Sequence, residues 1–192
     1  MINTIILVGP RASGKTTVGK MLARCLKLSF VDTDEMVQRK THKTIAQIVD
    51  EQGWDAFRMI ESQILKEVAI SGYIVATGGG MVISEMNRNY IKNKGIVFYL
   101  STSVEMVIRR LESNPAVNQR PSLTGLSITD EISDVIRIRD PLYHDAAHYV
   151  INANEEKEQV VEAIKSIYRA LLNDAANDVS RLFPIERATH SE

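Results

Sequence analysis

The sequence lacks the features of several large protein classes. Its 192 residues contain one cysteine, Cys25, which excludes a disulfide within the chain and fits a reducing compartment. The formal net charge is -1, so overall charge gives no reason to expect nucleic acid or an anionic membrane as a partner. No apolar run approaches the roughly 20 residues of a membrane-spanning helix, and the N-terminus has no signal-peptide pattern. We therefore expect a soluble, cytoplasmic protein, and nothing in the sequence indicates more than a monomer.

What the chain does have is an alternation of apolar, β-rich runs with segments of helical period. Hydrophobic residues make up 44% and charged residues 24%, an ordinary balance for one globular domain. Gly53 is expected to separate two helical pieces, and an amphipathic helix extends to about Leu172. Strand–helix units with short links predict an α/β fold with a central parallel five-stranded sheet, in three α/β/α layers. The expected strands lie within residues 4–9, 28–34, 73–80, 95–100 and 148–152.

Two stretches depart from this alternation. Residues 112–127 are polar, contain two prolines and a glycine, and are long for a connection within a compact domain. Such a segment is typical of a mobile lid, a binding loop or disorder. Residues 174–192 show no clear periodicity, which suggests a loosely packed tail. We therefore expect a single domain over residues 1–173, with a lid at about 112–127 and a C-terminal tail.

The segment GPRASGKT, residues 9–16, carries the clearest chemical signal. It fits G-x-x-x-x-G-K-[ST] between a predicted strand and a predicted helix, the context that a phosphate-binding loop (P-loop) requires. Its backbone N–H groups can face a β-phosphate, Lys15 can reach the β- and γ-phosphates, and the Thr16 hydroxyl is placed to bind Mg²⁺. The alternative is a glycine-rich turn that only caps a helix. The expected nucleotide contacts are Gly9, Ala12, Ser13, Gly14, Lys15, Thr16 and Thr17.

Asp32 and Asp34 follow the second apolar run. Open α/β sheets bind ligands at the carboxyl ends of their strands, and residues two apart on a strand face the same way. Both carboxylates can then face one site, where phosphoryl transfer needs a metal ligand and a group that orients or deprotonates the nucleophile. The alternative is that one aspartate is the N-cap of a helix starting near Glu35. The sequence leaves both interpretations open.

Other candidate residues have two interpretations each. The triple glycine after the third run is either a tight turn or a site where a ligand reaches bare backbone. Arg58 and Glu61 have the i, i+3 spacing of an ion pair, which is either solvated or holds Arg58 for a carboxylate or phosphate. Arg120 suits a lid that closes over phosphates, and it equally fits a surface arginine. By themselves, Arg110 and Arg139 are interpreted as surface charges on helices.

Taken together, these motifs resemble the shikimate kinase family, in particular its type II members from enteric bacteria. The resemblance extends to about Leu172 and rests on GPRASGKTT, FVDTD, FRMIES, ATGGG, QRPSLTG and RDPLY, in that order. Many enzymes share the P-loop, whereas the combination of these segments is specific. The resemblance implies a P-loop kinase fold with a mobile lid. It also implies transfer of the ATP γ-phosphate to the 3-hydroxyl of shikimate, in aromatic amino acid biosynthesis, with Mg²⁺ as cofactor.

The resemblance further implies roles for individual residues in the shikimate site. Asp34 contacts the shikimate hydroxyls and accepts the proton of the nucleophile, within a substrate-binding helical region at about residues 33–62. Pro141 follows Asp140 and is close to Arg139, so the sequence leaves open how the Arg139 side chain is oriented. The residues implied around the shikimate carboxylate are Arg58 and Arg139, with Gly79 and Gly80 supplying backbone contacts and Glu61 holding Arg58.

For the nucleotide, the resemblance implies that Arg120 closes over the phosphates and that Arg110 lies against the adenine. Thr16 and Asp32 would hold Mg²⁺, Asp32 either directly or through water. Two alternatives remain. A gluconate-type kinase would keep the P-loop without needing the Phe-Arg-x-x-Glu and triple-glycine segments, and a nucleotide-binding regulator would have lost Lys15, Asp34 or Arg120. All three of those residues are present.

Overall fold

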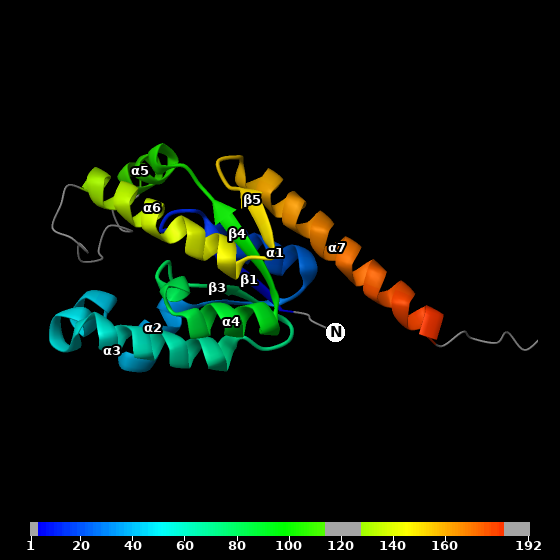
Figure 1. The fold of residues 1–192 in the computed structure, drawn as a ribbon, viewed down its shortest axis with the longest axis horizontal. Coiled ribbons are helices and arrows are strands. Elements are labelled where there is room, and N and C mark those ends of the chain that lie inside the picture. The colour runs from blue at the N-terminus through cyan, green and yellow to red at the C-terminus, as the bar shows by residue number, and fades with distance from the viewer. Residues whose placement is uncertain (1–3, 114–127, 183–192) are drawn as a thin grey trace, which may run out of the picture.

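The computed structural model describes residues 4–113 and 128–182, which form a parallel sheet between layers of helices (Figure 1). Its strand order is β2-β3-β1-β4-β5, and every pair of neighbouring strands is parallel. The predicted five-stranded parallel sheet is confirmed, and each strand falls within its expected segment except β4, which extends one residue further, to Ser101. The strands are β1 (Ile5–Val8), β2 (Ser29–Asp32), β3 (Tyr73–Ala76), β4 (Ile96–Ser101) and β5 (Tyr149–Asn152).

Helices cover both faces of the sheet because its central strands are apolar on both sides. In β1, Ile5 and Leu7 belong to one buried cluster, and Ile6 and Val8 belong to the other. Side chains of α1 and α7 complete the first cluster, and those of α2, α3, α4 and α6 complete the second. The helices are α1 (Lys15–Leu26), α2 (Thr33–Thr41), α3 (Ile45–Val68), α4 (Glu85–Lys94), α5 (Val104–Ser113), α6 (Ile128–Ala146) and α7 (Lys157–Leu182), with a 3-10 turn, η1 (Met81–Ile83).

Gly53 interrupts the helical pattern where the sequence predicts it. Its dihedrals (φ 82°, ψ 171°) are not helical, so α3 consists of two pieces that meet at a kink. The C-terminal piece carries Arg58 and Glu61 toward the carboxyl ends of the strands. A left-handed φ of this kind is accessible to glycine without a steric cost, which explains why glycine stands at the kink.

The boundaries at the ends of two helices differ from expectation. Glu112 and Ser113 complete α5, so the segment expected as a lid begins as helix. Residues 114–127, including Arg120, lie outside the described residues. The segment expected as a C-terminal tail, residues 174–192, likewise begins as helix, because α7 continues to Leu182, and the end of this helix runs past the sheet (Figure 1). Of the helices in the described segments, none is long and apolar enough to cross a membrane.

The topology gathers the candidate residues at one edge of the sheet. The P-loop follows β1, Asp32 is the last residue of β2, and the triple glycine follows β3. In a parallel sheet all of these connections leave from the carboxyl ends of the strands, so they meet at the same edge. The fold therefore places the P-loop, the two aspartates and the glycine segment next to one another.

Candidate active site

The P-loop wraps around the Lys15 side chain. Its Nζ donates to the carbonyl oxygens of Gly9 (2.9 Å) and Pro10 (2.7 Å) and to Ser13 Oγ (3.3 Å). Gly9 has φ 147°, and a Cβ there would lie 2.8 Å from the Leu100 carbonyl oxygen, so the loop requires glycine at this point. The P-loop thus has a compact form in which Lys15 lies at its centre.

Asp32 joins the P-loop helix to the next helix. Its Oδ2 accepts from the Thr16 hydroxyl at 2.7 Å, and its Oδ1 accepts from the backbone N–H groups of Asp34 (2.9 Å) and Glu35 (3.5 Å). The N-cap interpretation is therefore confirmed for Asp32. It does not exclude the metal interpretation, since one carboxylate oxygen serves the cap and the other faces the Thr16 hydroxyl.

Asp34 lies in a different element of secondary structure from the one expected. Strand β2 ends at Asp32, and Asp34 lies in the first turn of α2, so the argument from alternating strand residues is wrong. Its carboxylate nevertheless lies beside the triple glycine. A Cβ built on Gly78 would lie 2.7 Å from Asp34 Oδ1 and 2.5 Å from Glu61 Oε1. The two carboxylates thus flank a position that admits no side chain.

Arg58 and Glu61 form an ion pair in which the Glu61 side chain is 1% exposed and the Arg58 side chain 26% exposed. Burial raises the pKa of Glu61, and the neighbouring Arg58 opposes that shift. The Arg58 guanidinium also lies over the rings of Trp54 and Phe57, at 5.4 and 5.2 Å. The interpretation as a solvated surface pair is therefore wrong, because Arg58 is held by a buried carboxylate and two aromatic rings.

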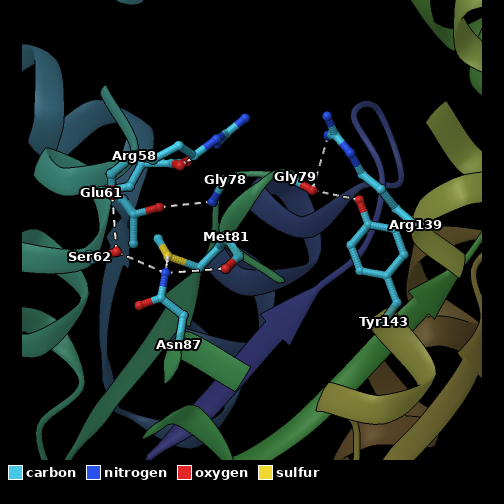
Figure 2. A network of polar contacts seen from close by, with 10 residues as sticks. Arg58, Glu61, Ser62, Gly78, Gly79, Met81, Asn87, Arg139 and Tyr143 are labelled. Atoms are coloured by element: carbon cyan, nitrogen blue, oxygen red, sulfur yellow. Dashed lines mark hydrogen bonds and ion pairs between the residues drawn. The ribbon is translucent and has the colours of Figure 1, made fainter. Parts of the chain in front are cut away.

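Arg139 comes to the same region from α6. Its Nη1 lies 3.4 Å from the Gly79 carbonyl oxygen, to which the Tyr143 hydroxyl also donates at 2.6 Å (Figure 2). Pro141 lies inside α6, and the helix continues through it, so the proline does not turn Arg139 away from the site. Arg139 and Tyr143 are four residues apart and therefore share one face of the helix.

One pocket brings the two arginines together. Arg58 of α3, Arg139 of α6, the backbone of Gly79 and Gly80, and the P-loop residue Arg11 all line it. A Cβ on Gly80 would overlap the Arg58 guanidinium, so the guanidinium can lie here only because residue 80 has no side chain. The pocket therefore combines three arginines with one carboxylate, Glu131, and the backbone of two glycines, and this excess of positive charge suits a small anionic ligand.

A second cavity, of about 590 Å³, lies on the other side of the P-loop. It is lined by residues of the loop and of α1, and by Arg110 and the loop before α7. Arg110 donates to the carbonyl oxygens of Ala12 (3.2 Å) and Ala153 (2.7 Å), and burial lowers its pKa. The Arg110 guanidinium thus connects the P-loop to the β5–α7 connection at the edge of this cavity, rather than lying on the open surface.

Several residues in the site were not singled out from the sequence. Thr33 is fully buried, and its hydroxyl accepts from the Gly78 N–H at 2.8 Å. Arg11 was visible as a basic residue within the P-loop, and Trp54 as the one tryptophan of the chain, four residues before Arg58. Tyr143 is the last residue of the family segment RDPLY, but no role was predicted for it, because a tyrosine in an apolar segment is usually interpreted as core.

The comparisons with known proteins agree with this geometry. A family model described as shikimate kinase matches residues 11–169. "Shikimate kinase 2" of Enterobacter sp. (strain 638) is 47% identical over 169 residues, which is 88% of this chain and 97% of that protein. This chain belongs to the shikimate kinase family. Its activity is accordingly that of an ATP-dependent small-molecule kinase acting on shikimate.

Solved structures support the same assignment. Shikimate kinase from Acinetobacter baumannii, determined in complex with shikimate, is 36% identical, with a TM-score of 0.80 over 91% of this chain and 95% of that chain. A gluconokinase from Sinorhizobium meliloti shares the fold at 13% identity and a TM-score of 0.57. The P-loop kinase fold is therefore shared by this chain and both solved enzymes, and the likeness to the gluconokinase shows the fold alone.

Proposed function

We propose that this chain transfers the ATP γ-phosphate to the 3-hydroxyl of shikimate in the pocket between α3 and α6. The observation that carries the proposal is that Arg58 and Arg139, from separate helices, line one pocket that also contacts the P-loop. Arg58 is fixed by Glu61 and by aromatic rings, and the Arg139 guanidinium lies at the Gly79 carbonyl. Two arginines held in this way favour a carboxylate, which each can bind through paired N–H donors.

Asp34 is the group that receives the proton in this proposal. Its carboxylate lies next to Gly78, the residue before the pocket-lining Gly79, and Asp34 stands two residues after the metal-site candidate Asp32. The 3-hydroxyl oxygen attacks the γ-phosphorus, the bond to the ADP β-phosphate oxygen breaks, and the hydroxyl proton passes to Asp34. The backbone of Gly79 and Gly80 lines the same pocket and would contact the substrate there.

The P-loop supplies the charge that this transfer requires. Backbone N–H groups of Gly9 and of residues 12–17 surround the phosphates, and Lys15 exchanges its bonds with the Gly9 and Pro10 carbonyls for the β- and γ-phosphates. The 590 Å³ cavity takes the nucleoside, with Arg110 at its edge. Arg120 and the lid at about residues 112–127 come from the family resemblance and remain predictions.

Thr16 and Asp32 are the residues that would hold Mg²⁺. They fit the ion, because their Oγ1 and Oδ2 atoms lie 2.7 Å apart and both are the hard oxygen ligands that Mg²⁺ prefers. Within the described residues no group of three His, Cys, Asp or Glu side chains could hold a metal, which agrees with an ion that keeps waters and substrate phosphates as ligands. When bound, Mg²⁺ neutralises charge on the β- and γ-phosphates.

The product identifies the reaction. The chain is incubated with ATP, Mg²⁺ and shikimate, and the phosphorylated carbon is assigned by phosphorus–proton correlation NMR. The proposal predicts one product with phosphate on the 3-hydroxyl. Phosphate on another hydroxyl, or ATP hydrolysis without phosphorylated shikimate, would contradict it. A monomeric state and a cytoplasmic location in aromatic amino acid biosynthesis complete the proposal, and light scattering of the purified protein tests the first of these.

A further inference from the structure

The segment Gly78–Met81, which we call the glycine loop, is held at each of its two ends by the side chain of another residue. The Gly78 N–H is bound by Thr33 Oγ1, and the Met81 carbonyl oxygen accepts from Asn87 Nδ2 at 3.2 Å. Between these two anchors, the Gly79 carbonyl oxygen accepts from the Tyr143 hydroxyl (Figure 2). The loop is therefore held at three points, and the Tyr143 contact is the one on the side of α6.

The two donors to Gly79 are unequal. The Tyr143 hydroxyl lies at 2.6 Å, a short O–H···O bond, whereas Arg139 Nη1 lies at 3.4 Å, beyond the usual range for N–H···O. A carbonyl oxygen has two lone pairs, and here Tyr143 approaches the oxygen closely while Arg139 stays at long range. The bond between Arg139 and Gly79 is therefore weak, so that little is lost when a carboxylate replaces Gly79 as its partner.

The Tyr143 bond also sets the orientation of a peptide plane. The described residues contain no cis peptide bond, and in a trans peptide the C=O and the following N–H point in opposite directions. Fixing the Gly79 carbonyl on Tyr143 consequently directs the Gly80 N–H away from α6. Gly80 in turn packs on Arg58, since a Cβ there would overlap the guanidinium. One hydroxyl thus influences both arginines of the pocket.

Tyr143 is itself rigidly placed. It is 1% exposed, and its ring stacks on Tyr99 with centroids 5.0 Å apart. The Tyr99 hydroxyl donates to Asp140 Oδ1 at 2.6 Å, which ties the stack back to α6. Burial raises the pKa of Tyr143 to about 12, so its hydroxyl remains a donor throughout the physiological range.

We infer that Tyr143 is a positioning residue of the shikimate site: its hydroxyl holds the Gly79–Gly80 peptide and thereby sets the reach of Arg139 and Arg58 for the substrate carboxylate. This inference rests on the proposed function. Tyr143 touches neither substrate in this arrangement and acts through the glycine loop. Its loss should therefore affect the binding of shikimate and leave the binding of ATP and the chemical step nearly unchanged.

The test compares Tyr143→Phe with Thr4→Val in the full chain. Thr4 is 2% exposed and donates its hydroxyl to the Ile70 carbonyl oxygen at 2.8 Å, at the opposite end of the sheet. Both variants remove one buried hydroxyl that donates to a backbone carbonyl, so both should lower the melting temperature by a similar amount, about 2–4 °C. Shikimate affinity is read from the fluorescence of Trp54, which lines the pocket and is the one tryptophan of the chain.

For Tyr143→Phe we expect the shikimate Kd and KM to rise about tenfold, with kcat and the ATP KM within about twofold of wild type. Thr4→Val should leave all four constants unchanged. In an Arg139→Lys background the effect of Tyr143→Phe should shrink to below about threefold, because the two side chains share one acceptor. Equal effects in both backgrounds, or equal changes for ATP and shikimate, would overturn the inference. Wild-type protein that binds no shikimate would instead refute the proposed function.

Discussion

The Thr16 hydroxyl donates to Asp32 Oδ2 over 2.7 Å, which joins the first turn of the P-loop helix to the end of strand β2. The same carboxylate caps α2 through its other oxygen. The two functions that the sequence presented as alternatives are thus compatible within one side chain. Because the cap uses Oδ1, Asp32 can turn Oδ2 toward a metal ion without losing its structural role.

Asp32→Asn separates these two functions. Asparagine caps helices as well as aspartate does, so the free energy of unfolding should change by less than about 0.5 kcal/mol, whereas Asp32→Ala should lose about 1 kcal/mol. The lost charge should raise the Mg²⁺ concentration needed for half-maximal activity by about tenfold in both variants. Urea unfolding and Mg²⁺ titrations of turnover measure the two effects. A normal Mg²⁺ requirement in Asp32→Asn would show that Asp32 is a cap and nothing more.

Asp34→Asn tests the proton acceptor. An amide cannot take the proton of the 3-hydroxyl, so kcat should fall by about 10²–10⁴. The ATP Kd should stay within about twofold of wild type, because the P-loop does not depend on this side chain. Steady-state turnover and equilibrium ATP binding are measured on the same preparation. If ATP binding falls in proportion to turnover, Asp34 is structural and another group accepts the proton.

Gly80→Ala and Gly79→Ala form a matched pair of neighbouring substitutions. A Cβ on Gly80 would overlap the Arg58 guanidinium, whereas a Cβ on Gly79 would lie at least 3.5 Å from its neighbours, which is ordinary contact. Since the overlap is with the end of a flexible side chain, Gly80→Ala should fold and displace Arg58. Its shikimate Kd should rise about tenfold or more, and that of Gly79→Ala distinctly less. A larger rise of the shikimate Kd in Gly79→Ala than in Gly80→Ala would contradict a role of Arg58 in binding shikimate.

Arg58→Ala has two consequences that a second substitution can distinguish. It leaves the 1%-exposed Glu61 carboxylate without its ion-pair partner, which should cost about 3–5 kcal/mol of stability. It should also raise the shikimate KM about 10- to 100-fold, since hydrogen bonds to charged groups contribute about 1.5–3 kcal/mol. The change in the ATP KM should be much smaller.

Adding Glu61→Gln to Arg58→Ala removes the buried charge. The double variant should regain much of the lost stability in urea unfolding, because a neutral amide is less costly to bury than a carboxylate. Its shikimate KM should stay high, because Arg58 is still absent. Recovery of both properties together would mean that Arg58 affects shikimate only through the stability of α3.

The sequence predicted the sheet and the P-loop well because both follow from local patterns. Continuous apolar runs mark buried parallel strands, and glycine and lysine at fixed spacing mark the phosphate-binding loop. The apolar pattern did not predict helix α4, because this helix is mostly polar, with Asn87 and Ile91 as its buried residues. Arg139 was expected on a helix, but the apolar pattern did not define helix α6, because three of its apolar side chains, Ile132, Val135 and Ile136, line the pocket.

The contacts of the site depend on residues far apart in the chain, and no local pattern contains them. Asp34 was expected in the site for a wrong reason, since it lies on a helix and not on a strand. Thr33 is buried against Gly78, and Tyr143 against Gly79, across 45 and 64 residues. Propensity and spacing identify the polar residues, whereas the tertiary packing of α2, α3 and α6 decides which of them share a pocket.

The release of ADP, measured with shikimate, gluconate and nucleoside monophosphates in parallel, tests most directly whether the pocket between Arg58 and Arg139 serves shikimate. The geometry predicts turnover with shikimate that depends on Mg²⁺. The other acceptors should give no more ADP than ATP does alone, because they lack the ring carboxylate and hydroxyl arrangement that the arginines and Asp34 favour. Turnover with gluconate or a nucleotide, and none with shikimate, would contradict this assignment.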